Sequence, residues 1–337
     1  MVRESLQLVL AERPTTNIVP GKPFQHVKVP AASATMQGPY CTPTEADLKD
    51  GELLLESLYL SIDATMRNWL QYKRSFLPPV QVGEVMRGIT VSRVLASKSS
   101  KVKTGDLVTA MLGFREMGIL PEDWVQVPAP LPANATSRDL IGLFCWSGLS
   151  GYFGMTKIGV PKPGDTVVVS AAAGATGNVA AQCRWLKEDL RLDVVLNYKD
   201  ADFDQKFIEA TPDWIDVCFD GVGGQVLDLA LIRAKPHARF VLCGQVSQYN
   251  SEKRQGPDGQ AFLNIVYQRI KLQGFLVTDW TPEFPKAIAQ LGRWPAEGKI
   301  KRKETLVTGG MAAAEEAFGI LFDSKSFGLV QVKDPEA

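Results

Sequence analysis

The sequence has few of the residues from which zinc sites and disulfide frameworks are built. Its 337 residues include only two histidines, His26 and His237, and five cysteines. The cysteines are far apart, form no CxxC pair and are odd in number: Cys41, Cys145, Cys183, Cys218 and Cys243. Because a zinc ion needs three or four clustered ligands of these types, we expect neither a metal site nor a disulfide framework.

An excess of charge of one sign and a long apolar segment are also missing. The 37 Lys and Arg residues balance the 37 Asp and Glu residues, so no strong field attracts nucleic acid or an anionic membrane. No apolar run approaches the roughly 18 residues of a membrane-spanning helix, and Glu4 stands where a signal peptide would be basic. These features predict a cytosolic protein with a small-molecule partner, and no nucleic-acid or membrane partner.

The two parts of the chain differ in their patterns. Residues 1 to about 130 combine prolines with short apolar runs and turns, which is typical of a β-rich, barrel-like domain. From about residue 135, helical patterns alternate with apolar strands, which we expect at 166–170, 193–196, 215–219 and 239–243. This alternation predicts an α/β domain with a parallel, doubly wound sheet. The apolar segment 329–332 is a further expected strand, and it is a candidate to return to the first domain.

The most informative segment follows the expected strand at 166–170. Ala172, Gly174 and Gly177 have the spacing of a GxGxxG loop with alanine at its first position, and a helical pattern follows. Small residues there let the backbone approach a pyrophosphate, whose charge the helix N-terminus stabilises. The alternative, a tight turn without a ligand, is less favoured because a strand and a helix flank the loop as the motif requires.

A dinucleotide fold places the group that reads the cofactor's ribose about 20 residues beyond these glycines. The sequence has Asn197, Tyr198 and Lys199 in that region and no acidic residue. A cation there suits the 2′-phosphate of NADPH better than the free hydroxyl of NADH. We therefore predict NADPH as the cofactor, while Lys199 taken alone is equally compatible with an ordinary solvated loop.

Several motifs together resemble a known family. Besides the loop they are Gly83–Gly88, Phe219–Gly224 and Cys243–Asn250, with further marks at 62–67, 151–154, 297–300 and 326–328. In this order they cover nearly the whole chain. They resemble the zinc-independent medium-chain dehydrogenases/reductases of the leukotriene B4 dehydrogenase, prostaglandin reductase and alkenal double-bond reductase group.

This resemblance implies an architecture and an assembly. It implies a GroES-like β-barrel catalytic domain formed by residues 1–132 and 305–337. It also implies a Rossmann NADPH-binding domain of residues 133–304, and a homodimer. In the family, the strand that corresponds to residues 271–277 commonly lies at the subunit contact, whereas the sequence itself shows only that this segment can form a strand.

The resemblance also implies a reaction, the NADPH-dependent reduction of the C=C bond of α,β-unsaturated ketones and aldehydes, with hydride delivered to the β-carbon. Without zinc, a hydroxyl donor must stabilise the developing enolate oxygen. Tyr249 is the catalytic candidate, because its Ser-Gln-Tyr-Asn context is similar to that of a tyrosine in relatives; the alternative is an aromatic that only walls the cleft. The candidate cofactor-binding residues are Ala172, Gly174, Ala175, Thr176, Gly177, Tyr198, Lys199, Gly221, Cys243, Phe275 and Ser326.

The sequence also departs from the family. Between Gln182 and Cys183 it lacks a stretch that, in relatives, forms the second strand and carries a lysine for the 2′-phosphate. Residues 193–197 are therefore the third strand by resemblance but the second by spacing. Either the sheet is shortened and Tyr198 and Lys199 reach the ribose, or a coding segment is missing and cofactor affinity suffers. Gly221 and Ser326 replace two asparagines of the family.

Two other functions remain open at this point. One is a different reaction of the same family, the reduction of quinones or of biosynthetic enoyl intermediates. The other is a cofactor-impaired, non-catalytic homologue, which the missing stretch and the glycine at position 221 suggest. The intact small-residue loop at 171–177 favours an enzyme over this last interpretation.

Overall fold

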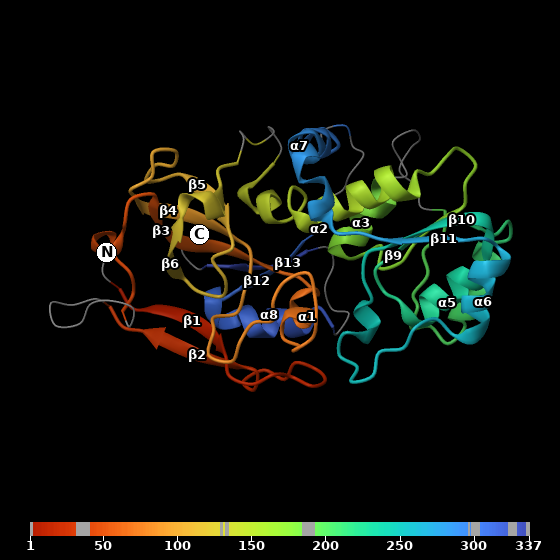
Figure 1. Ribbon diagram of the computed structural model, residues 1–337, viewed down its shortest axis with the longest axis horizontal. Coiled ribbons are helices and arrows are strands. Elements are labelled where there is room, and N and C mark those ends of the chain that lie inside the picture. The colour runs from red at the N-terminus through yellow and green to blue at the C-terminus, as the bar shows by residue number, and fades with distance from the viewer. Residues whose placement is uncertain are drawn as a thin grey trace. The chain divides into compact units, whose positions relative to one another are not determined.

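The computed structural model describes residues 3–31, 41–128, 131, 135–183, 193–295, 297, 304–322 and 329–334. The chain divides into two compact units, one of Met1–Gly142 with Lys303–Ala337 and one of Leu143–Arg302. Figure 1 traces both units along the chain. The domain limits expected from the sequence, 1–132 with 305–337 and 133–304, stay a prediction.

The first unit is built on a mixed sheet with the strand order β12-β13-β3-β4-β5-β7, in which β6 also pairs with β3. These strands are β3 (Glu52–Ile62), β4 (Thr90–Ser97), β5 (Leu107–Ala110), β6 (Met117–Pro121), β7 (Val125–Gln126), β12 (Glu304–Thr308) and β13 (Leu329–Lys333). A separate antiparallel hairpin consists of β1 (Ser5–Leu10) and β2 (Phe24–Val29). The unit also contains the short helices α1 (Met66–Trp69) and α8 (Ala314–Ile320) and several 3-10 turns.

Strand β13 joins the end of the chain to this first unit. It pairs antiparallel with β3, with Val330 opposite Ile62, and parallel with β12. The predicted strand at 329–332 and its return to the β-rich domain are therefore confirmed. Strand β3 is buried along most of its length, which explains why three leucines occupy its consecutive positions 53–55, where a half-exposed strand would alternate apolar and polar residues.

The second unit contains a four-stranded parallel sheet with the order β11-β10-β9-β8. Its strands are β8 (Val167–Val169), β9 (Ile215–Asp220), β10 (Ala234–Leu242) and β11 (Lys271–Gly274). Its helices are α2 (Trp146–Phe153), α3 (Ala175–Cys183), α4 (Phe203–Ala210), α5 (Gly224–Ile232), α6 (Gly259–Tyr267) and α7 (Phe284–Arg293). Within this unit, α2 and α3 lie on one side of the sheet and α5 and α6 on the other (Figure 1). The predicted parallel, doubly wound sheet is confirmed.

Neighbouring residues of β9 pack on opposite faces of this sheet, as the pleat of a strand requires. Cys218 belongs to the apolar cluster that includes Phe207 of α4 and Leu231 of α5, and burial raises the pKa of its thiol well above the ordinary value. Phe219 faces the other side, where a Cβ added to Gly154 would lie 2.6 Å from its ring. A glycine at position 154 therefore lets the chain after α2 approach the sheet closely.

The expected strand at 193–196 is wrong. Residues 193–197 form no strand, and the side chains of Val194 and Val195 are 52% and 75% exposed; only Leu196 packs against the core of the unit. An apolar run becomes a strand only where a neighbouring strand takes its backbone hydrogen bonds, and the run itself does not specify that neighbour. Among the strands that the structure describes, β8 is consequently the edge of the sheet, so this segment is neither a second nor a third strand.

Candidate functional site

The candidate residues of the second unit gather at the carboxyl ends of its parallel strands. Strand β8 continues through residues 170–174 into α3, and β9 continues through residues 221–223 into α5. Strand β10 is followed by Cys243 and a short helical turn, Val246–Gln248, and β11 is followed by Phe275. Because the strands are parallel, these four connections lie at one edge of the sheet, the edge at which open α/β sheets bind their ligands.

The loop between β8 and α3 is held in a tight turn by its own backbone. The amide of Gly174 donates a hydrogen bond of 2.8 Å to the carbonyl oxygen of Ala171, and Ala171 adopts the left-handed φ of 49°. A Cβ added to Gly177 would overlap that same carbonyl oxygen, and one added to Gly174 would lie 3.2 Å from it. The first turn of α3 therefore approaches the loop more closely than a larger residue at position 177 allows.

This geometry fits a dinucleotide. Residues Ala172, Gly174, Ala175, Thr176 and Gly177 all lie in the turn or in the first turn of α3. Their small side chains leave the backbone amides at the helix N-terminus accessible to a pyrophosphate. The loop predicted from its spacing is thus a strand-turn-helix with the required close packing, and the contact of each residue with a cofactor stays a prediction.

A buried network joins this loop to the connection after β9. The hydroxyl of Ser170 donates a 2.7 Å hydrogen bond to Oδ1 of Asp220 and accepts one of 2.9 Å from the amide of Gly221. Asp220 also accepts hydrogen bonds from the amides of Val222, at 3.1 Å, and Gly223, at 2.9 Å. Burial raises the pKa of the Asp220 carboxyl, while these hydrogen bonds act in the opposite direction. Gly221 was among the predicted site residues, whereas Ser170 and Asp220 were not.

The connection after β10 is hydrogen-bonded to the backbone of Asp220 and Gly221. The amide of Cys243 donates to the carbonyl oxygen of Asp220 at 2.7 Å, and the amide of Val246 donates to that of Gly221 at 3.0 Å. Tyr249 follows this turn with 8% of its surface exposed. Its hydroxyl oxygen accepts a hydrogen bond of 3.3 Å from the amide of Gln245. Three of the candidates, Gly221, Cys243 and Tyr249, are thus brought together by backbone contacts.

Gly221 itself borders open space. A Cβ added at this position would meet no atom within 4 Å, and its φ lies outside the left-handed region. A Cβ therefore fits here without a clash, and the backbone conformation at this position does not require glycine. The next two residues differ, because Gly223 and Gly224 have φ values of 68° and 57°.

Tyr198 and Lys199 lie in a turn that does not adjoin any strand among the described residues. The side chain of Tyr198 is 50% exposed, and the Lys199 ammonium lies 5.9 Å from the centre of its ring. Asn197 closes the turn with a 2.9 Å hydrogen bond from its side-chain amide to Asp200. Both side chains are accessible to a ligand, and their role at the ribose stays a prediction.

The remaining candidates are at the far strand and the end of the chain. Phe275 follows β11, and its ring centre lies 5.5 Å from that of Trp280. A Cβ added to Gly154 would lie 3.1 Å from the Phe275 ring, so this residue covers the sheet where α2 ends. Ser326 lies outside the described residues.

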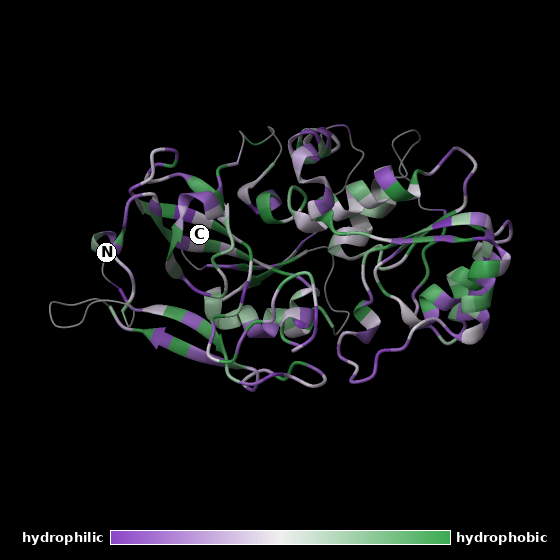
Figure 2. Ribbon diagram, viewed as in Figure 1, coloured by the Kyte–Doolittle hydropathy of each residue, from purple (hydrophilic) through white to green (hydrophobic). Residues whose placement is uncertain are grey.

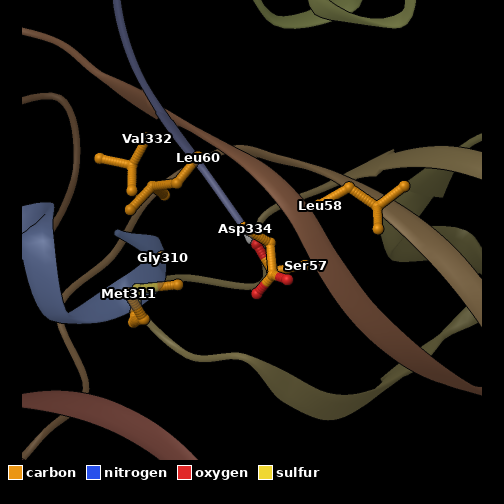
Figure 3. A pocket seen from close by; sticks show the side chains of 7 residues that line it. All are labelled: Ser57, Leu58, Leu60, Gly310, Met311, Val332 and Asp334. Atoms are coloured by element: carbon orange, nitrogen blue, oxygen red, sulfur yellow. The ribbon is translucent and has the colours of Figure 1, made fainter. Parts of the chain in front are cut away.

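Other site types find little support in the described part of the chain. No group of three or more His, Cys, Asp or Glu residues there is arranged to hold a metal ion, and no helix there is both long and apolar enough to cross a membrane. A small cavity in the first unit is lined by Ser57, Leu58, Leu60, Gly310, Met311, Val332 and Asp334 (Figure 3). Its volume of about 10 Å³ admits one water molecule at most, far less than the roughly 300 Å³ or more of a ligand pocket.

Comparison with family models covers both units. Residues 35–127 match the model described as the N-terminal domain of oxidoreductase, and residues 169–293 match the model described as zinc-binding dehydrogenase. Despite the second description, the described residues offer no ligand set for zinc.

Individual relatives narrow the assignment. The chain is 33% identical to the putative NADP-dependent oxidoreductase YfmJ of Bacillus subtilis, over 85% of this chain and 90% of the relative. It is 33% identical to the NADPH-dependent curcumin reductase of Escherichia coli (84% and 88% covered) and 34% identical to prostaglandin reductase 1 of Rattus norvegicus (85% and 90%). The crystal structure of CurA from Vibrio vulnificus in complex with NADPH is 31% identical with a TM-score of 0.84, covering 98% of this chain and all (100%) of that one. The chain belongs to the prostaglandin reductase and curcumin reductase group of the zinc-independent medium-chain dehydrogenases/reductases, the family that its motifs predicted.

Proposed function

We propose that this NADPH-dependent oxidoreductase reduces the C=C bond of α,β-unsaturated ketones and aldehydes. The observation that carries the proposal is the tight glycine loop at the carboxyl edge of the parallel sheet, in which Gly177 packs against the Ala171 carbonyl. Its relatives support the reaction class, because they include reductases named for curcumin and prostaglandins and a structure in complex with NADPH.

The chemistry divides between the cofactor and the chain. When bound, NADPH supplies the hydride that adds to the β-carbon of the substrate. The turn before α3 binds the pyrophosphate through backbone amides. The hydroxyl of Tyr249, held beside the Gln245 amide, donates a hydrogen bond to the substrate oxygen as negative charge develops there. A proton delivered to the α-carbon completes the saturated product.

Two measurements on the purified protein test this function. Calorimetric titration with NADPH and NADH in parallel should show binding, with preference for NADPH. Oxidation of NADPH should then require an enone or enal, and mass spectrometry should find the saturated carbonyl compound. Semiquinone formed from an added quinone, without enone reduction, would indicate a quinone reductase instead. Failure to bind either nucleotide would indicate a cofactor-impaired homologue.

Replacing Gly221 by asparagine is expected to strengthen NADPH binding. A Cβ at this position meets no atom within 4 Å, and one added hydrogen bond of about 0.5–1.5 kcal/mol corresponds to about 2- to 10-fold in Kd. Gly221→Ala is the matched control. Both variants should gain about 0.4–1 kcal/mol in the free energy of unfolding from the lost glycine entropy, but only the asparagine should lower the Kd. Equal Kd values for the two variants would contradict an amide contact.

We also propose that the protein forms a homodimer through β11 and α6. Strand β11 pairs with β10 on one edge and with no described strand on the other, and a free edge is a template for a second strand. Helix α6 exposes a set of large apolar side chains, Phe262, Leu263, Val266 and Tyr267, within a hydrophobic stretch of ribbon (Figure 2). A second copy that covers both features removes an exposed apolar patch from water.

Val266→Asp is therefore expected to shift the protein toward monomer in sedimentation velocity measurements. Val266 is 62% exposed, so a charge there is tolerated in the monomer but opposes burial at an interface. Gln260→Glu, on the same helix and also exposed, adds the same charge without removing apolar surface. A monomeric wild type, or dimerisation that Val266→Asp leaves unchanged, would contradict this assembly.

A further inference from the structure

Ser170 and Asp220 occupy equivalent places on two neighbouring parallel strands. The last paired residues of β8 and β9 are Val169 and Phe219, and the amide of Ser170 extends the ladder with a 3.0 Å hydrogen bond to the Phe219 carbonyl. The two side chains follow directly after this point, and both are buried, with 6% and 1% of their surfaces exposed. Each one begins a connection that contains candidate cofactor-binding residues.

The Asp220 carboxylate is buried without a cationic partner among the ion pairs that involve described residues. A buried charge is tolerated only when hydrogen bonds replace its lost hydration, and here one hydroxyl and two backbone amides do so. The two amides, of Val222 and Gly223, directly precede α5. The carboxylate therefore fixes the backbone of the β9 connection, and the Ser170 hydroxyl ties the β8 connection to it.

The same residues hold the third connection. The carbonyl oxygens of Asp220 and Gly221 accept hydrogen bonds from the amides of Cys243 and Val246, which lead to Tyr249. The residue before the glycine turn, the start of the β9 connection and the start of the β10 connection are thus joined by one hydrogen-bond network. The Ser170 hydroxyl makes two hydrogen bonds to this network, one with the Asp220 carboxylate and one with the Gly221 amide.

We infer that Ser170 and Asp220 are positioning residues for the dinucleotide, which hold the turn before α3 in register with Gly221 and the β10 connection. This inference rests on the proposed function and deepens it. Neither residue needs to contact the cofactor. They act on affinity because the dinucleotide must contact the amides at the start of α3 and the connection that begins at Gly221 at the same time. Holding both segments in place before binding reduces the entropy lost on binding and so strengthens it.

Asp216 provides a matched control on the same strand. Its carboxylate also links β9 to the residue directly before β8, by a 2.9 Å hydrogen bond from the Thr166 amide, and it accepts a 2.6 Å hydrogen bond from Lys235. It lies at the opposite, amino end of the sheet, away from the four connections. Asp216→Asn therefore perturbs the same pair of strands without touching the network at the carboxyl edge.

The test compares Ser170→Ala, Asp220→Asn, Ser170→Thr and Asp216→Asn with the wild type. Ser170→Ala and Asp220→Asn should raise the Kd for NADPH about tenfold or more, because each removes a hydrogen bond to a charged group. In the free protein, amide hydrogen exchange should become faster at both 171–174 and 221–223. Ser170→Thr, which keeps the hydroxyl, should restore both properties, and Asp216→Asn should lower Tm while leaving the Kd unchanged.

Three outcomes decide the inference. An unchanged Kd and unchanged exchange in Ser170→Ala would overturn it while leaving the proposed function intact. An equal loss of affinity in Asp216→Asn would also overturn it, since the effect would then be one of general stability. If the wild type binds no NADPH, the proposed function fails, and exchange in the free protein still decides: faster exchange in both connections supports the link, and unchanged exchange overturns it.

Discussion

Replacing Gly177 by alanine is expected to weaken NADPH binding by about 10- to 100-fold. The added Cβ would overlap the carbonyl oxygen of Ala171 and lie 2.9 Å from that of Ser170. Both atoms are backbone, so relief requires the turn or α3 to move. Overpacking of this kind costs about 1–3 kcal/mol, which corresponds to about one to two orders of magnitude in Kd if the displaced loop no longer fits the pyrophosphate.

Calorimetric titration of Gly177→Ala with NADPH measures this effect directly. Gly319→Ala is the control, because Gly319 lies in helix α8 of the first unit and an added Cβ there meets no atom within 4 Å. That substitution should raise stability by about 1 kcal/mol through helix propensity and leave the Kd unchanged. Wild-type affinity in Gly177→Ala would show that the loop is a turn without a ligand, the alternative that the sequence left open.

In the second unit, the elements that could be predicted from the sequence are those whose pattern lies within a few neighbouring residues. The strands at 166–170, 215–219 and 239–243 were recognisable because each is a short apolar run bounded by polar or small residues, and β8, β9 and β10 occupy these places. The loop at 172–177 was recognisable because its glycines are required by close packing within a few residues of one another.

Features that depend on a distant partner were not predictable in this way. The run at 193–196 has the composition of a strand, but no described strand pairs with it. The Ser170–Asp220 hydrogen bond joins residues 50 positions apart. Nothing in the sequence around either residue indicates that the other is its partner. The serine at the end of an apolar strand and the aspartate before Gly221 become informative only once the order β9-β8 is known.

The residues expected to bind the cofactor's ribose also depend on a strand pairing that the sequence does not specify. Spacing alone predicts Tyr198 and Lys199 near a 2′-phosphate, because residues 193–197 were expected to form the second strand and these two residues follow its end. In the structure residues 193–197 form no strand, and the two side chains lie in a turn closed by the hydrogen bond between Asn197 and Asp200. Residues 193–197 are therefore neither the third strand that the resemblance implied nor the second strand that the spacing implied. Recognition of the 2′-phosphate by Lys199 stays a prediction, which the NADPH and NADH titrations test.

Replacing Tyr249 by phenylalanine is expected to lower kcat for enone reduction by about 10²- to 10³-fold, the range for loss of one donor to a developing oxyanion. The Kd for NADPH should not change. The tyrosine hydroxyl oxygen is positioned by the hydrogen bond that it accepts from the Gln245 amide, and a phenolic hydroxyl is able both to accept and to donate. Single-turnover reduction of an enone at saturating NADPH measures the chemical step without interference from product release.

The same variant separates this role from a structural one. If Tyr249 only supports the turn at Gly244, where an added Cβ would lie 2.9 Å from its hydroxyl, then phenylalanine lowers Tm and NADPH affinity and leaves the chemical rate nearly intact. Tyr72→Phe is the matched control, since Tyr72 is 77% exposed and its ring contact with Arg13 does not need the hydroxyl. A lower rate with an unchanged Kd places the hydroxyl at the reacting oxygen, because a donor that acts only in the transition state contributes nothing to the binding of the cofactor.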